Sequence, residues 1–203
     1  VRHKSLSIMK GLPSLKSELN PHQMQAVETT EGHVLVLAGA GSGKTRVIIE
    51  KVVHLVNKGL PARKIAAITF TNKAAAEMQE RVRALLGRRP KQGPVISTFH
   101  AYCVQILRRH IARLGYPAQF AIYDRGDQES LARRVLREIH VDSAALRPAD
   151  LLAIIGRWKT ASVRPPRAAS LANSDKEHLA AAAYRRYQRT LKNAGAVDFD
   201  DLL

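Results

Sequence analysis

The chain has 203 residues, 45% of them hydrophobic, enough for one large or two small domains with a real core. Lys and Arg number 33 against 17 Asp and Glu, and because the excess is spread over both halves, the folded surface should be basic. Such a surface favours nucleic acid over a membrane as partner, with general solubility charge as the alternative. The single cysteine excludes a disulfide framework and suits a cytoplasmic setting.

The chain opens with a basic stretch, residues 1–16, that lacks a signal-peptide core and is predicted to be a loose leader. A short helix is predicted next, over residues 18–27, with Asn20 as N-cap and Pro21 at the first helical position. The amide of Gln23 in this helix could read the edge of an adenine. On the sequence alone, a solvent-facing glutamine is the more probable interpretation.

A glycine-rich turn follows the branched aliphatic run Val34–Leu37, which predicts a buried strand. The turn leads through Lys44 and Thr45 into an apolar helix. This spacing matches the phosphate-loop pattern, except that alanine stands at its first glycine. The alternative is a glycine-rich turn that merely starts a helix, but the strand and helix around it favour nucleotide binding.

The chemistry of this loop depends on backbone N–H groups that point inward, and Gly41 and Gly43 allow the unusual dihedral angles that this needs. The amides and the positive helix end would hold polyphosphate. Lys44 would reach the β- and γ-phosphates of ATP, and the Thr45 hydroxyl would ligate Mg²⁺. The predicted nucleotide site comprises Gln23, Ala38, Gly39, Ala40, Gly41, Ser42, Gly43, Lys44, Thr45 and Arg46.

Two further strands are predicted at residues 65–70 and 94–99, each followed by a helix, at 73–86 and 100–114. Strand–helix alternation implies an α/β fold with a parallel sheet covered by helices. Functional groups then collect at the carboxyl ends of the strands. Two clusters there combine an aromatic ring with polar groups, which suits stacking of a base beside a held phosphate; the alternative for each phenylalanine is a core residue. The clusters are Phe70, Thr71, Asn72 and Lys73, and Thr98, Phe99 and His100.

The second half of the sequence lacks strand alternation. Residues 120–124 are predicted to be a short connector, followed by helices at 127–140, 148–159 and 175–194, with a loop at 163–167. This predicts a small all-helical module, in which Trp158 is expected in the core. Eight cations could form a basic face of this module, with solvated helix faces as the alternative. They are Arg133, Arg134, Arg137, Arg157, Lys159, Arg185, Arg186 and Arg189.

Five separated segments together resemble the superfamily 1A DNA helicases of the Rep/UvrD/PcrA type, most of all Rep. The segments resemble the Q motif, motif I, motif Ia, motif Ib and the return from subdomain 1B to 1A, in that order. They are Leu19–Gln23, Ala38–Arg46, Ile68–Met78, Ile96–His100 and Ala196–Leu202.

The resemblance implies a P-loop (RecA-like) parallel sheet in subdomain 1A, residues 17–116, interrupted by an all-helical insert, subdomain 1B, residues 117–195. Residues 196–203 would return the chain towards 1A. It also implies ATP- and Mg²⁺-dependent 3′-to-5′ translocation on single-stranded DNA and 3′-tailed duplex, with accessory replication or repair proteins as possible partners. Gln23 would read adenine, and both aromatic clusters would line the DNA path.

The sequence departs from the family in lacking the acidic Walker B motif, the arginines that stabilise the transition state and the second motor domain. Because phosphoryl transfer depends on such charge stabilisation, the expectation is an N-terminal fragment that binds nucleotide weakly and hydrolyses almost none. Two other classes stay open: a nucleic-acid-binding module without ATP turnover, and a small P-loop kinase or GTPase.

Overall fold

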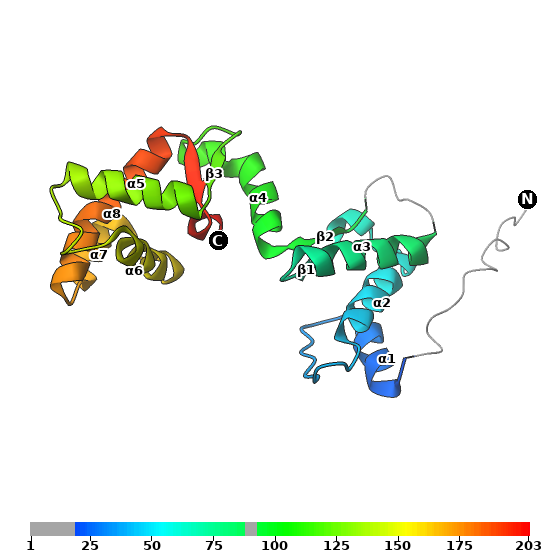
Figure 1. Ribbon diagram of the computed structural model, residues 1–203. Helices are drawn as coiled ribbons and strands as arrows, with labels where there is room; N and C mark the ends of the chain where they lie inside the picture. Colours follow the sequence, from blue (N-terminus) through cyan, green and yellow to red (C-terminus); the bar gives the residue numbers. More distant parts are fainter. Residues whose placement is uncertain (1–18, 88–92) are drawn as a thin grey trace, which may run out of the picture. The chain divides into compact units, whose positions relative to one another are not determined.

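The computed structural model describes residues 19–87 and 93–203, and its packing divides the chain into two units, with the boundary along the sequence between Phe99 and His100 (Figure 1). The predicted basic leader, residues 1–16, lies outside the described residues. None of the described helices is long and apolar enough to cross a membrane.

The first unit contains a parallel pair of strands with helices around it. Strands β1 and β2 pair in register from Ala66 opposite Val95 to Thr69 opposite Thr98. Its core joins side chains of α2, α3 and both strands, with Met78 and Val82 almost fully buried. The parallel pairing confirms the mixed α/β class. The elements are α1 (Pro21–Glu28), α2 (Lys44–Asn57), η2 (Ala62–Lys64), β1 (Ala66–Thr69), α3 (Asn72–Leu86) and β2 (Val95–Thr98).

Helix ends in the first unit follow the predicted capping rules. The side chain of Asn20 accepts a hydrogen bond from the Gln23 amide at 2.9 Å, and the Gln23 side chain accepts one from the Asn20 amide in return. Thr71 caps α3 by accepting from the Ala74 amide at 3.1 Å. Such caps satisfy N–H groups that the first helical turn leaves without an intrahelical partner, so the starts of α1 and α3 are fixed locally.

The prediction of a strand at Val34–Leu37 was wrong. These residues are not in a strand, and Leu35 and Leu37 are 83% and 87% exposed. A strand of a parallel sheet is normally covered on both faces and paired along its edges. Within residues 19–87 and 93–99, β1 and β2 pair only with each other, so no strand is paired with this segment. Apolar composition alone therefore did not produce a strand here.

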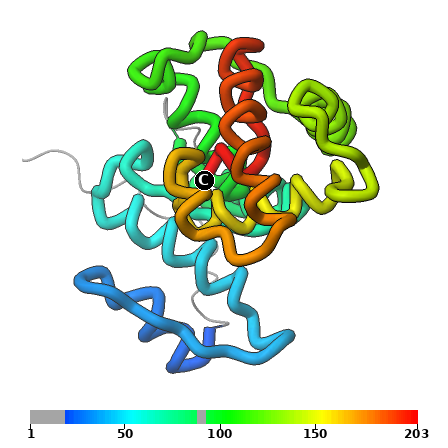
Figure 2. Tube along the Cα trace, turned by 90° about the vertical axis from the view of Figure 1, so that its left-hand side faces the viewer, coloured from blue at the N-terminus to red at the C-terminus, as the bar shows by residue number. Residues whose placement is uncertain are grey.

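The second unit is mostly helical, and its last segment returns to pair with its first strand. Figure 2 shows α8 leading into this C-terminal return. Strands β3 and β4 pair in parallel, with Ala121 opposite Ala196 and Tyr123 opposite Asp198. The elements are α4 (Phe99–His110), η3 (Ile111–Leu114), β3 (Ala121–Tyr123), α5 (Arg125–Glu138), α6 (Pro148–Thr160), α7 (Pro165–Ala168), η4 (Ala169–Leu171), α8 (Asp175–Asn193), β4 (Ala196–Asp198) and η5 (Asp200–Leu202).

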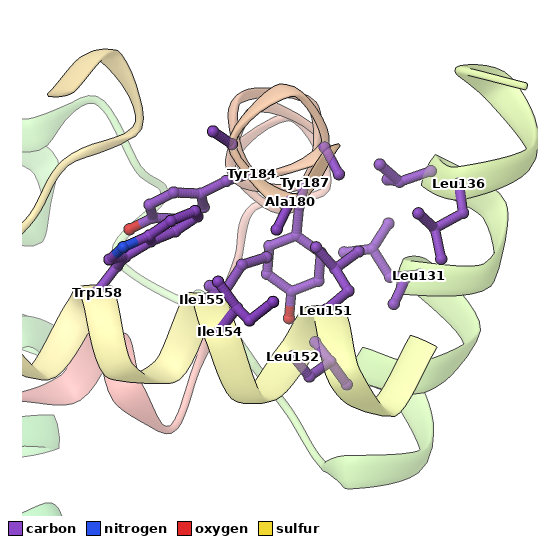
Figure 3. Close-up of a cluster of buried hydrophobic side chains, with 14 of the residues drawn as sticks. Leu131, Leu136, Leu151, Leu152, Ile154, Ile155, Trp158, Ala180, Tyr184 and Tyr187 are labelled. Atoms are coloured by element: carbon purple, nitrogen blue, oxygen red, sulfur yellow. The ribbon is translucent and has the colours of Figure 1, made fainter. Parts of the chain in front are cut away.

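Helices α5, α6 and α8 enclose the main core of this unit (Figure 3). Leu151 and Ile155 of α6 are almost fully buried against α8. The ring of Trp158 stacks on that of Tyr184, with centroids 5.9 Å apart and planes 22° apart. The prediction that Trp158 is a core residue is confirmed.

Three expectations for this half of the chain were wrong. The connector at residues 120–124 contains β3, so the module is not purely helical. The loop at residues 163–167 contains the start of α7. Lys159, expected on a basic face, has a side chain only 5% exposed. Strand β3 and the burial of Lys159 depend on partners distant in sequence, which a local pattern does not reveal.

Buried tyrosines predict a loss of stability at alkaline pH. Burial raises the pKa of Tyr187 and Tyr184 far above the ordinary value near 10. The unfolded chain therefore ionises these phenols at a pH where the native state keeps the protons, so the free energy of unfolding falls as pH rises above about 10. We expect the melting temperature to drop between about pH 9 and about pH 11, and Tyr187→Phe to reduce that slope. Equal slopes for both proteins would contradict this.

Candidate functional site

The predicted phosphate loop is a tight turn that leads directly into α2. Gly41 and Gly43 adopt φ angles of +74° and +80°, in the left-handed region that glycine tolerates best. The Gly39 carbonyl accepts hydrogen bonds from the amide and the hydroxyl of Ser42, at 3.4 and 2.7 Å. Because α2 begins at Lys44, the positive end of its dipole lies at the loop. The dihedral angles expected for Gly41 and Gly43 are confirmed.

The ammonium group of Lys44 lies at the mouth of this loop. Its Nζ donates to the carbonyl oxygens of Ala38 and Gly39, at 3.0 and 2.6 Å. Both bonds are exposed, so phosphate oxygens could replace these carbonyls as acceptors and form stronger, charge-assisted bonds. Thr45 follows in the first turn of α2 and is exposed, while Arg46 is half-buried. Ammonium, hydroxyl and loop amides together form a donor set that suits a polyphosphate.

Gln23 ties α1 to the loop. Its Nε2 donates to the Ser42 carbonyl at 2.9 Å in an exposed hydrogen bond, and the residue is half-buried, so the side chain is held against the loop while solvent still reaches part of it. A cavity of about 150 Å³ lies beside it, smaller than the 300–1,000 Å³ of most ligand pockets. It can hold only part of a nucleotide, such as a base. Its lining is Asn20, His22, Gln23, Ala26, Val36, Leu37, Ala38, Ser42, Lys44 and Val47.

The two predicted aromatic clusters begin at the same edge of the strand pair. Since Thr69 lies opposite Thr98 in parallel register, Phe70 and Phe99 leave the sheet at the same end. Phe70 is 89% exposed and Phe99 57% exposed, so neither is a core residue. The polar residues of the two clusters differ in exposure. The side chain of Thr71 caps α3 and Thr98 is buried. The exposed ones are Asn72, Lys73 and His100.

The sequence profile of the UvrD/REP helicase N-terminal domain matches residues 19–203. The chain belongs to this family. It is 45% identical over 186 residues to the ATP-dependent DNA helicase Rep of Escherichia coli K12, which covers 91% of the chain. It is 41% identical over 195 residues to the ATP-dependent DNA helicase PcrA of Leuconostoc citreum, covering 95% of the chain. The chain spans 28% of the length of that Rep and 26% of that PcrA.

One aromatic residue of this UvrD/REP domain was missed as a site residue. Phe199 lies between β4 and η5, is 47% exposed, and meets the ring of His100 edge to face, with centroids 6.0 Å apart and planes 74° apart. Phe199 lies nearly a hundred positions after His100 in the sequence, and the C-terminal return of the chain brings the two rings together. The available signal was a lone aromatic among the acidic residues of the segment 198–201, directly after a strand.

Gly43 of this family's loop offers a sharp test of nucleotide binding. An alanine at position 43 would have to adopt φ near +80°, and its Cβ would lie 3.0 Å from Gln23 Nε2. A left-handed non-glycine residue costs about 1–3 kcal/mol, so Gly43→Ala should weaken binding of a fluorescent ATP analogue about tenfold or more. Gly32→Ala is the matched control, because Gly32 lies outside the loop, adopts a similar φ of +73°, and its Cβ would meet no atom within 4 Å. Equal affinities of the two variants would contradict a role for the turn.

Proposed function

We propose that the chain forms the nucleotide-binding and part of the DNA-binding surface of an ATP-dependent 3′-to-5′ DNA helicase. The observation that carries this is the turn of Gly41 and Gly43, which brings the Lys44 ammonium to the loop carbonyls at the start of α2. The relatives named as ATP-dependent DNA helicases support it. Because the chain spans only about a quarter of their length, the activity of the whole protein is part of the proposal.

The loop residues would bind and orient the triphosphate. Amides of residues 39–45 and the Lys44 ammonium would neutralise phosphate charge, and the Thr45 hydroxyl would hold Mg²⁺. When bound, Mg²⁺ and ATP supply the cation and the transferable phosphoryl group. Gln23 would set the position of the base, since its amide is already fixed between Asn20 and Ser42. The described residues that line the cavity include no acidic side chain, so we propose that this chain alone hydrolyses ATP very slowly.

The exposed aromatic residues would contact single-stranded DNA. Phe70 and Phe99 present their rings at one edge of the first unit, and Phe199 is partly exposed beside His100 in the second. Stacking on aromatic rings is worth about 1–3 kcal/mol per base and tolerates any sequence, as a translocating motor requires. Lys73 would add a contact to phosphate. We further propose the RecA-like subdomain 1A at residues 17–116, subdomain 1B at 117–195, and a return of the chain towards 1A at 196–203.

The deciding experiment measures ATP hydrolysis by the full-length protein with and without single-stranded DNA. Strong stimulation by DNA supports the motor. DNA binding without ATP turnover would instead indicate a binding module, and turnover that ignores DNA but phosphorylates a small acceptor would indicate a kinase. Comparing the unwinding of a duplex that carries a 3′ tail with that of a duplex that carries a 5′ tail tests the proposed 3′-to-5′ direction of translocation.

Salt dependence tests how the basic surface is used. The net charge of +16 predicts that Lys and Arg side chains displace counterions from the DNA phosphates on binding, so the affinity for single strands should fall steeply as salt rises. Each neutralised phosphate contributes about −0.7 to the slope of log affinity against log salt for single strands. A fluorescent oligonucleotide titrated at several salt concentrations gives this slope. A flat response would show that the cations serve solubility rather than binding.

A further inference from the structure

A buried ionic network in the second unit adjoins the segment that carries Phe199. Lys159 of α6 places its Nζ 2.6 Å from Asp198 Oδ2 and 2.8 Å from Asp201 Oδ1. The side chain of Lys159 is 5% exposed and that of Asp198 is 2% exposed. Residues 198 and 201 bracket Phe199, so one lysine holds both ends of the turn from which this ring projects.

Further hydrogen bonds fix the same turn. The Asp201 amide donates to Asp198 Oδ1 at 2.9 Å, and the Asp198 amide donates to Asp201 Oδ2 at 3.3 Å. From α8, the Tyr187 hydroxyl donates to Asp198 at 3.1 Å, and the Gln188 amide donates to both oxygens of Asp201 at 3.2 and 3.1 Å. Each carboxylate is therefore held from α6, from α8 and from the opposite end of the turn.

Helix α6 also lies close to this turn. A Cβ on Gly156 would lie 3.1 Å from Asp200 Oδ2, so the glycine lets the Asp200 side chain lie against α6. Phe199 itself leaves this rigid frame and stays 47% exposed. Its ring meets His100, which comes from the start of the unit, at a centroid distance of 6.0 Å.

Stability does not by itself account for such a network. Burying a lysine and two carboxylates carries a desolvation penalty, and apolar residues of similar volume are often as stabilising or more so. A buried ion pair does impose a defined geometry, because each buried charge needs an opposite charge or a hydrogen-bond partner at a fixed position. Lys159 also cannot be a phosphate contact, since its ammonium is buried and engaged by two carboxylates.

We propose that Lys159 is a positioning residue for DNA binding. It fixes the turn at residues 198–201 so that Phe199 is held edge to face with His100 and presented to a base. This inference rests on the proposed function, because it takes Phe199 to be a DNA contact. Lys159 acts through Phe199 and touches no DNA itself.

The first test follows the Phe199 ring without DNA. With fluorophenylalanine at position 199 of the whole chain, we expect one sharp ¹⁹F resonance shifted by the neighbouring imidazole. Lys159→Met should broaden it or move it to the solvent value, and the milder Tyr187→Phe, which keeps the core ring, should move it part of the way. Arg157→Gln is the control, because that side chain lies on the same helix and is 67% exposed. An unchanged resonance in a folded Lys159 or Tyr187 variant would overturn the proposal.

The second test is a double-mutant cycle on the affinity for single-stranded DNA. Lys159→Met should weaken binding about tenfold when Phe199 is present and less than about twofold in a Phe199→Ala background, with the salt slope unchanged. Equal losses in both backgrounds, or a shallower slope, would overturn the proposal, because a general folding defect or a phosphate contact would then explain the effect. If the unaltered protein binds no DNA while the ¹⁹F shifts occur, the proposed function fails although the positioning of Phe199 holds.

Discussion

Replacing Lys44 with alanine should lower DNA-stimulated ATP hydrolysis by the full-length protein about 10²–10³-fold. Removing a single preorganised donor that stabilises transition-state charge typically costs this much. Lys44 is the ammonium placed at the loop carbonyls, 3.0 and 2.6 Å from the Ala38 and Gly39 oxygens, where phosphate oxygens would replace them. The quantity to measure is kcat at saturating ATP and DNA.

Lys58→Ala provides the control for this substitution. Lys58 follows the same helix at its C-terminal end and is exposed, so its removal changes the net charge equally without touching the loop. Its kcat should stay within about twofold of the unaltered protein, since surface substitutions have small effects. Comparable losses for both lysines would show that overall charge, rather than the loop, controls turnover. DNA affinity without nucleotide should be the same for both variants.

The parts of this structure that the sequence predicted depend on neighbours along the chain. The cap at Asn20 and the left-handed glycines of the phosphate loop require only residues within a few positions, so their chemistry is visible in the sequence. The parallel pairing of β1 and β2 followed from alternation of short strands with helices. The Lys44 position in the loop followed from the same local spacing.

The parts that were missed depend on distant partners. The run Val34–Leu37 is apolar enough for a strand, but strand formation also requires an adjacent strand, which residues 19–87 and 93–99 do not supply. Strand β3 has three residues, and its partner β4 lies more than seventy positions later. Lys159 was expected on a basic face or on a solvated helix face, and only the return of Asp198 and Asp201 explains its burial.

The same network predicts the largest loss of stability in the second unit. Lys159→Met should lower the free energy of unfolding by about 3–5 kcal/mol, because it leaves two carboxylates without their counter-charge. Burial already raises the pKa of Asp198. Without the lysine that pKa rises further, so the native state binds the proton more tightly than the unfolded chain does. The loss should therefore be greatest near neutral pH and shrink as acid protonates the carboxyl.

Removing all three charges distinguishes this cause from a simple packing defect. Lys159→Met combined with Asp198→Asn and Asp201→Asn leaves no uncompensated ion, so it should recover most of the stability lost by the single variant. Arg157→Gln, which breaks only an exposed pair with Glu177, should change stability by less than about 1 kcal/mol. Denaturant unfolding followed by far-UV circular dichroism gives the free energy of unfolding of the triple variant, of Lys159→Met and of Arg157→Gln. If the triple variant is as unstable as Lys159→Met, the aliphatic stem of Lys159 and its packing, rather than its charge, stabilise this unit.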